Sequence, residues 1–422
     1  MRDRSEAKSR EDLRTDSAEN PCAGTQPVVK RSAWRKLAAS AIIAAGFCWV
    51  VFLFAITLTD HDVAGRDYIQ YWAEGRQVLN RANPFDAAAI LQLERSAGQD
   101  RTEAELSGSP PLILLLVTPF ALLSAKNGLV LWFAVMLAAF SLSIWVLWLL
   151  HGRPDTLLYL FGFLFAPAIA CLQSGQISIL FLLSILAFLY FLEVHPWLAG
   201  ACLVPLTLKP HLFLVFAVAL LLWTFSRRAY GVLAGFAVAL GICLAATFYL
   251  DPHAWSQYLQ MMKMQNLIGD FVPTLSESMQ RLINPRWIWL RFVPAAAACV
   301  WAAWYFRIRQ NRWSWMHQGM VTLLVSCLCA PYGFFFDESI LLPAVLTGMV
   351  RAPRSGRSLY PIWIAGAAAL IECLRRVRVT SLFYLWTAPA WLIWYLYATK
   401  DDRLAIADKP PTVSYEVQPL SR

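Results

Sequence analysis

Residues 128–150 read GLVLWFAVMLAAFSLSIWVLWLL, a run that contains no charged side chain. Because a helix rises about 1.5 Å per residue, a run of this length covers the ~30 Å hydrocarbon layer of a bilayer. Apolar runs of comparable length recur along the chain, separated by short polar breaks. This pattern predicts helices that cross a membrane several times.

The composition supports the same class of protein. Of the 422 residues, 58% are hydrophobic and 15% are charged, and the mean hydropathy is +0.50. Soluble chains carry about a quarter charged residues, so a soluble protein is excluded. The net charge is +9, but Lys and Arg gather at the ends of apolar runs, which indicates membrane topology and not a nucleic-acid interface. We predict an all-α polytopic membrane protein with about 11–13 membrane helices or half-helices, the bilayer as partner and no nucleic acid.

The cysteines suggest no metal chemistry. Eight of the nine lie in or at the ends of apolar runs, where a thiol behaves as a small hydrophobic group. Cys327 and Cys329 form a C-x-C pair, but no further Cys or His stands nearby at ligand spacing. We therefore expect no metal and no cofactor.

Charge and length divide the chain into regions. Residues 1–35 are polar and of mixed charge, which predicts a disordered cytoplasmic tail. Residues 36–399 form the predicted multispanning domain, and 400–422 a second cytoplasmic tail. Basic residues crowd the start of the first apolar run, Leu37–Leu58, whereas acids dominate residues 59–109. The positive-inside rule places the outer loop 59–109 on the opposite side from the tail.

This outer loop is far longer than a connection between two membrane helices needs, which suggests a function. Within it we predict helices from Tyr68 to Leu79 and from Phe85 to Arg95, lying along the membrane surface.

The chain must cross the membrane an odd number of times between the outer loop and the cytoplasmic residues Arg227 and Arg228. Six apolar runs are visible in this interval, so one of them does not count as a separate crossing. Either 198–225 is one long kinked helix, or the Pro-flanked run 110–124 enters the membrane and returns. The second solution is favoured, and it brings Gln176 and Lys209 to the outer side. It leaves Arg375, Arg376 and Arg378 outside, against the positive-inside rule and without an explanation.

Asp67 is the first candidate for chemistry. It lies a few residues after the first predicted membrane helix, where water and lipid meet, and a carboxylate there can take a proton from a sugar hydroxyl. The alternative is a solvated loop acid, or an N-cap for the helix that begins at Tyr68.

Lys209 is the second candidate, because an ionisable residue at membrane depth is costly unless it faces a cavity or a partner. Pro205 and Pro210 break the helix around it, and a lysine suits a phosphate group. The alternative is a lysine at a helix end that reaches toward the interface. Gln176 offers an amide to hydroxyls or phosphate, although a tight turn explains its segment equally well. Asp337 and Glu338 form an acidic spot that can bind a sugar or merely end a loop.

The order of short motifs resembles glycosyltransferase family 87, which includes bacterial polyprenyl-phosphate-mannose-dependent α-mannosyltransferases. The motifs are Gly65-Arg-Asp67-Tyr68-x-x-Tyr71-Trp72, Asn83-Pro-Phe-Asp86, Ser109-Pro-Pro111, Gly175-Gln176, Lys209-Pro210 and Asp251-Pro-His-Ala-Trp255. Together they extend the likeness over about residues 40 to 350. The resemblance implies a C-type fold with its active site on the outer face of the bacterial inner membrane. It also implies inverting transfer from a polyprenyl-phosphate sugar to a lipid or glycan acceptor.

The resemblance carries the catalytic base over to Asp67, with mannose as the expected hexose. We expect substrate binding by the following residues: Arg66, Tyr68, Tyr71, Gln176, Lys209, His211, Asp337 and Glu338. The characterised mannosyltransferases also have a histidine in a later outer loop, but the segment after Pro331 reads Tyr-Gly-Phe-Phe-Phe-Asp. The sugar and the acceptor therefore stay open.

Two other classes of function compete with a membrane glycosyltransferase. A transporter or flippase for a lipid-linked or polar solute would also use broken helices and buried ions, but it should show internal repeats, and the hydropathy shows none. A non-catalytic scaffold would leave the long acidic outer loop without a task.

Overall fold

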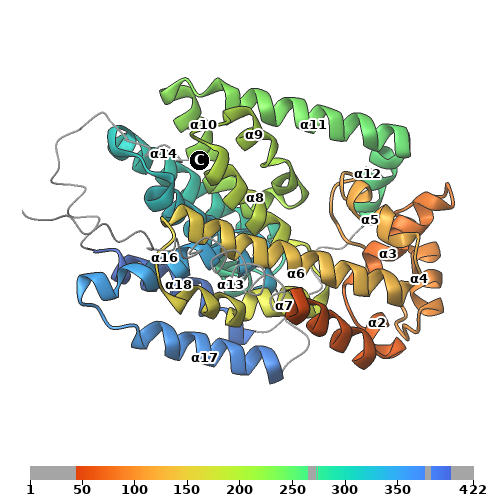
Figure 1. Cartoon of the computed structure of the whole chain (residues 1–422). Coiled ribbons are helices and arrows are strands. Elements are labelled where there is room, and N and C mark those ends of the chain that lie inside the picture. Colours follow the sequence, from red (N-terminus) through yellow and green to blue (C-terminus); the bar gives the residue numbers. More distant parts are fainter. Residues whose placement is uncertain (1–43, 265–271, 273, 376–381, 401–422) are drawn as a thin grey trace, which may run out of the picture. The chain divides into compact units, whose positions relative to one another are not determined.

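The computed structural model describes residues 44–264, 272, 274–375 and 382–400 (Figure 1). The predicted tail 1–35, nearly all of 400–422, and Arg376 and Arg378 lie outside the described residues. The chain divides into two compact units, residues 1–53 and residues 54–422. The second unit contains every described helix from α2 onward.

Every described element is a helix, and the described residues contain no strand. The helix Ala44–Thr57 is followed in sequence by four short helices, α2 (Asp60–Ala64), α3 (Tyr68–Leu79), α4 (Ala87–Ser96) and α5 (Ile113–Ala121). The bounds of α3 are those predicted. The second predicted helix starts two residues late, because Asp86 caps it by accepting hydrogen bonds from the backbone N–H groups of Ala88 and Ala89.

The middle of the chain alternates long and short helices. Their bounds are α6 (Ala125–Leu150), η1 (Leu157–Leu164), α7 (Ala166–Ser174), α8 (Ser178–Phe191), α9 (Pro196–Ala201), η2 (Val204–Leu208), η3 (Pro210–Leu212), α10 (Leu214–Arg227), α11 (Tyr230–Leu250), α12 (Ala254–Met264) and α13 (Leu275–Ile283).

The last part of the chain is broken more often. Its elements are η4 (Ile288–Phe292), α14 (Val293–Arg309), η5 (Gln310–Arg312), η6 (Trp315–Gly319), α15 (Met320–Leu328), η7 (Phe335–Leu341), α16 (Leu342–Arg351), η8 (Pro353–Ser355), α17 (Tyr360–Arg375), η9 (Leu382–Tyr384) and α18 (Thr387–Ala398).

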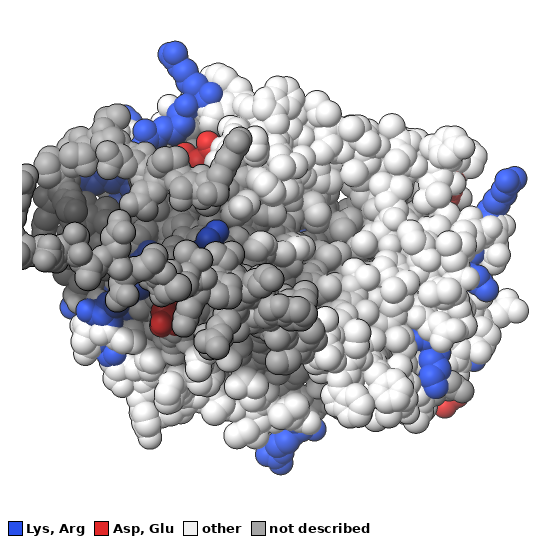
Figure 2. Space-filling model, viewed as in Figure 1, with Lys and Arg blue, Asp and Glu red and all other residues white. Residues whose placement is uncertain are grey.

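Three described helical stretches are long and apolar enough to cross a membrane: α6, α11 and Ile288–Arg312. A fourth crossing exists if η1 and α7, bent by 47°, count as one span. Other predicted spans are shorter apolar helices, among them α8 and α10. The protein is thus an all-α polytopic membrane protein. The 11–13 predicted segments included half-helices, and in the described part of the chain three or four of the stretches are long enough to span a membrane. Figure 2 shows a broad uncharged area on one face, as the flank of a membrane protein requires.

Within the predicted run 110–124 the structure has the nine-residue helix α5, and contacts with α3 flank it, whereas its return within the membrane stays a prediction. Near its start, Ser107 donates to Glu74 of α3, and near its end Arg76 and Trp72 of the same helix donate to the carbonyls of Ala121 and Leu123. Both ends therefore lie against α3.

The predicted run 198–225 is divided into α9, η2, η3 and α10, with Lys209 at the break. Pro205 and Pro210 have no backbone N–H and favour short 3-10 turns over a continuous helix here. Farther along the chain, η7 packs against α7 and α8. These two arrangements bring Lys209 and η7 to the junction between α7 and α8.

Candidate active site

Asp67 does not serve as a helix cap. It occupies the residue before α3, but its backbone is already helical and its carboxylate makes no hydrogen bond to the start of the helix. Instead, Asp67 Oδ2 accepts a hydrogen bond from Gln176 Nε2 (2.9 Å). The structure therefore does not support the N-cap alternative.

Gln176 reaches Asp67 because of the glycine before it. Gly175 ends α7 in the left-handed conformation (φ 75°), and a Cβ added to it would lie 2.6 Å from the Cβ of Tyr68. Only glycine combines this φ with such a close approach. Tyr68 is fully buried in this contact, and its role in substrate binding stays a prediction.

The side-chain oxygen of Gln176 faces two donors. Tyr71 Oη donates to Gln176 Oε1 (2.9 Å), and Lys209 Nζ lies 3.5 Å from the same oxygen. These donors orient the amide so that its N–H group points at Asp67. Tyr71 is fully buried, and its hydroxyl contacts Gln176.

Lys209 forms a buried ion pair with Asp337, with 2.8 Å between Nζ and Oδ1. Its ammonium also lies 5.0 Å from the centre of the Phe336 ring. Asp337 accepts further hydrogen bonds from the hydroxyl of Ser178 and from the backbone N–H of Phe334. These partners hold the ammonium group of Lys209 in place.

Glu338 has different partners from its neighbour. Its carboxylate accepts hydrogen bonds from Thr387 Oγ1 (2.7 Å) and Trp391 Nε1 (2.9 Å) of α18. The predicted acidic pair thus separates, with Asp337 in the site and Glu338 holding the last helix.

Arg66 and His211 lie at the margins of the network. The guanidinium of Arg66 donates to the carbonyl of Gln173, in the last turn of α7, and lies 5.2 Å from the centre of the Phe54 ring. His211 is half-buried, with its ring 6.0 Å from that of Tyr332. Arg66 thus satisfies a helix C-terminus, where a cation is favourable.

Burial raises the pKa of the Asp67 carboxyl above its ordinary value. The hydrogen bond from Gln176 and the charges of Lys209 and Arg101 act in the opposite direction and lower this pKa. A base works best when its pKa lies near the working pH, so a raised value suits proton acceptance. Among the described residues, no group of three His, Cys, Asp or Glu is arranged to hold a metal ion.

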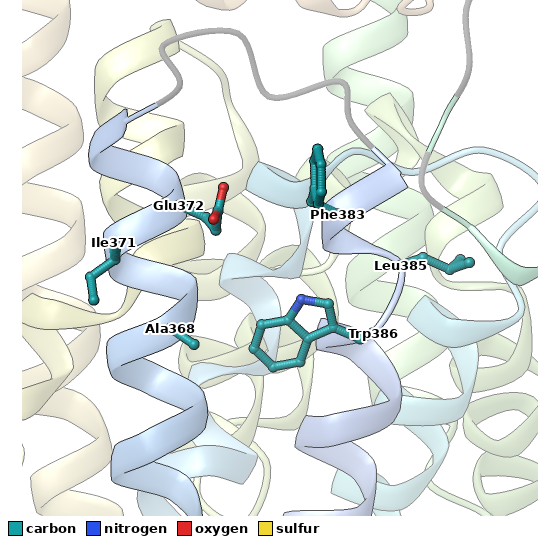
Figure 3. Close-up of a pocket in the computed structure, with 6 residues that line it drawn as sticks. All are labelled: Ala368, Ile371, Glu372, Phe383, Leu385 and Trp386. Atoms are coloured by element: carbon teal, nitrogen blue, oxygen red, sulfur yellow. The ribbon is translucent and has the colours of Figure 1, made fainter.

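An apolar groove of about 740 Å³ opens between α17 and the segment that leads into α18. In Figure 3, Phe383 and Trp386 lie across this groove from Ala368 and Glu372. A smaller cavity of about 90 Å³ shares Leu385 with the groove and is also lined by Phe334 and Glu338. The backbone N–H of Phe334 also donates to Asp337 (3.0 Å), the partner of Lys209.

Sequence reasoning missed the residues that hold the network together. Ser178 lies two positions after Gln176, and Gln173, whose carbonyl accepts from Arg66, lies three positions before it. Their closeness to Gln176 in the sequence could have suggested that both belong to the network. Phe334 and Phe336 could not be found by searching for polar side chains. Phe334 contributes its backbone N–H, and Phe336 contributes the face of its ring.

The comparison with protein families gives one result. A model described as glycosyltransferase family 87 matches residues 109–331, which is more than half of the chain. This range contains Gln176, Lys209 and His211, whereas Asp67 precedes it and Asp337 follows it. No curated protein and no solved structure matches the chain. On the extent of the family match and the helical membrane fold, this chain belongs to glycosyltransferase family 87 and is a membrane glycosyltransferase.

Proposed function

We propose that the protein transfers a hexose, most simply mannose, from a polyprenyl-phosphate sugar to a glycan or glycolipid acceptor on the outer face of a bacterial inner membrane. The observation that carries this proposal is the bond between Gln176 and Asp67. This hydrogen bond joins the outer-loop motif that contains Asp67 to the Gly175-Gln176 motif. Lys209, of the Lys209-Pro210 motif, contacts the side-chain amide of the same glutamine.

The chemistry follows from this arrangement. Asp67 accepts the proton of the acceptor hydroxyl as that oxygen bonds to the anomeric carbon. The bond between this carbon and the lipid phosphate oxygen breaks, and polyprenyl phosphate leaves with the electron pair. Attack from the face opposite the phosphate inverts the anomeric configuration. Lys209 stabilises the growing charge of the phosphate, an electrostatic contribution that is often the largest in such sites.

The groove between α17 and Trp386 supports a lipid-linked donor. Its lining is apolar apart from Glu372. Phe334, which lines the smaller cavity beside it, donates its backbone N–H to Asp337, the partner of Lys209. A hydrocarbon chain in the groove would place its phosphate toward the cation. This arrangement favours a lipid phosphate over a soluble nucleotide as the carrier of the sugar.

The test uses the purified chain in vesicles with a panel of radiolabelled sugar donors. The panel contains synthetic polyprenyl phosphates that carry mannose, glucose or galactose, and the matching nucleotide sugars. We expect label transfer to an added glycan from polyprenyl-phosphate mannose and none from the nucleotide sugars. Transfer from nucleotide sugars alone would contradict the proposed donor.

A transporter or flippase remains the alternative function. It predicts movement of the intact labelled donor across the vesicle membrane, without release of polyprenyl phosphate.

A further inference from the structure

Arg291, in the short helix η4, is an arginine with only 2% of its surface exposed. Its Nη2 lies 2.5 Å from Oε2 of the fully buried Glu277, and its Nε donates to the side-chain oxygen of Gln280. A buried charge is tolerated where it is paired and hydrogen-bonded, and such partners hold it in one position. Arg291 is therefore a fixed support for the side chain that lies against it.

That side chain is Tyr332. The guanidinium carbon of Arg291 lies 5.0 Å from the centre of the Tyr332 ring, a cation–π contact. Two further rings meet Tyr332 edge to face: Phe292 with ring centres 6.4 Å apart, and His211 with ring centres 6.0 Å apart. The Tyr332 ring is thus held by three neighbours from two separate parts of the chain.

Tyr332 lies close to the buried pair of Lys209 and Asp337. His211, which contacts its ring, follows Lys209 by two residues. Phe334, whose backbone N–H donates to Asp337 (3.0 Å), follows Tyr332 by two residues. Two residues span at most about 7 Å of extended chain, and Lys209 and Asp337 are themselves 2.8 Å apart. The two segments therefore run together, in contact at the rings and at the ion pair.

The hydroxyl of Tyr332 is buried, and within the described residues it has no hydrogen-bond partner. A buried hydroxyl without a partner destabilises a protein, so it calls for an explanation. The next two residues, Gly333 and Phe334, line the cavity of about 90 Å³ beside the apolar groove. A Cβ added to Gly333 would lie 3.4 Å from Leu212, so the segment after Lys209 packs here as well. Open space thus begins one residue away from an unpaired hydroxyl.

The polar groups of this region differ in charge. Lys209 carries the positive charge that suits a phosphate. Burial, together with the charge of Lys209, lowers the pKa of His211 to about 4, so its ring is uncharged at neutral pH. The hydroxyl of a tyrosine donates and accepts hydrogen bonds, as the hydroxyl groups of a sugar do. Beside the cation for the phosphate, the region therefore offers groups that suit a sugar.

We propose that the hydroxyl of Tyr332 hydrogen-bonds a hydroxyl group of the hexose on the lipid-linked donor, and so helps to select which hexose is transferred. This inference rests on the proposed function, since it locates the sugar of the same donor. The sugar is bonded directly to the phosphate, so a hexose at Tyr332 keeps its phosphate near Lys209. Arg291 would then be a positioning residue, because it acts through the Tyr332 ring.

The experiment measures equilibrium binding of two lipids to the full chain in nanodiscs: polyprenyl-phosphate mannose and polyprenyl phosphate without sugar. Tyr332→Phe keeps the ring and removes only the hydroxyl. It should weaken binding of the mannosyl lipid about threefold to tenfold, as expected for one neutral hydrogen bond, and leave binding of the sugar-free lipid unchanged. The matched control is Tyr249→Phe, at a tyrosine with 92% of its surface exposed, which should bind both lipids as the wild type does.

Two further measurements locate the contact. In a panel of mannosyl lipids that each lack a different sugar hydroxyl, one lipid should bind the wild type and Tyr332→Phe equally, because both complexes lack the hydrogen bond. In thermal unfolding without lipid, Tyr332→Phe should be at least as stable as the wild type, since it removes a buried hydroxyl that has no partner among the described residues.

A structural role for the hydroxyl gives different results. Equal weakening of both lipids by Tyr332→Phe, or the same loss with every lipid of the deoxy panel, would show that the hydroxyl does not contact the sugar. Wild-type affinity of Tyr332→Phe for every lipid would also overturn the inference while leaving the proposed function intact. A wild-type protein that bound neither lipid would remove the proposed donor, and this inference with it.

Discussion

Replacing Asp67 with Asn removes the proposed base and leaves its surroundings intact. The side-chain oxygen of Asn can accept the hydrogen bond that Gln176 now donates to Asp67 (2.9 Å), so Gln176, Tyr71 and Lys209 keep their positions. A hydrogen bond to a neutral oxygen is weaker than one to a carboxylate by about 1 kcal/mol, but burial favours the neutral side chain and offsets this loss. We expect normal folding and normal donor binding.

The rate should fall far more than the stability. General-base assistance contributes roughly 10²–10⁴-fold, which corresponds to about 3–5 kcal/mol of barrier. The assay is the initial rate of labelled sugar transfer in proteoliposomes at saturating donor. The matched control is Asp62→Asn, five residues earlier, because Asp62 caps α2 with Thr59 and has no contact with Gln176. This control should transfer sugar at the wild-type rate.

A rate for Asp67→Asn within tenfold of the wild type would refute the reasoning. The base would then be sought at Asp337, since Glu338 is engaged by Thr387 and Trp391.

Three other predictions concern the residues around Asp67. Because burial raises the pKa of Asp67, the transfer rate of the wild type should decline on acidification at a pH above the ordinary range of a carboxylate. Gln176→Leu removes a hydrogen bond that lowers this pKa. In a pH–rate profile, this variant should show the decline at a higher pH than the wild type. An unchanged profile would argue against the contact. Lys209→Met alone leaves Asp337 buried without its cation and should destabilise the protein by about 3–5 kcal/mol in thermal unfolding. Combining Lys209→Met with Asp337→Asn should restore this stability. The double variant should nevertheless bind polyprenyl phosphate weakly. Full donor binding by the double variant would exclude Lys209 from the phosphate site. Gly175→Ala places a Cβ within 2.6 Å of Tyr68 at a positive φ. This variant should lower stability by about 1–3 kcal/mol and reduce the rate of sugar transfer. Wild-type stability and rate would show that this turn does not position Gln176.

The helical membrane fold followed from composition and run length, because a bilayer demands apolar helices of fixed length. The number of uninterrupted spans did not follow, since hydropathy does not reveal where a helix breaks. In residues 198–225 the prolines predicted a break around Lys209, and the structure shows it, but not the two 3-10 turns η2 and η3 that separate α9 from α10. The packing of α5 against α3 involves contacts with Glu74 and Arg76, which lie far away in the sequence.

The site was predicted as a set of residue types but not as a network. Asp67 was recognised by its place just after the first predicted membrane helix, and Gln176 and Lys209 as polar groups between apolar runs. The structure brings these three together. The separation of Asp337 from Glu338 could not be predicted, because neighbours on a 3-10 turn point in different directions and their partners come from distant helices.

The buried roles of Tyr68 and Tyr71 were also unpredictable. A tyrosine beside a catalytic carboxylate has the same sequence pattern whether it contacts the substrate or packs against Gly175. The burial of Glu74 and Glu94 was missed for a related reason, since it depends on the backbone N–H groups of residues 105 and 107, which donate to these carboxylates.

The most direct test of the central claim is a double-label measurement on the wild-type protein. The chain is reconstituted with polyprenyl-phosphate mannose that carries one label in the sugar and another in the lipid, together with an acceptor glycan. We predict that one polyprenyl phosphate is released for each mannose that appears in the glycan. Labelled lipid and labelled sugar that cross the bilayer still joined, with no polyprenyl phosphate released, would contradict glycosyl transfer from this donor.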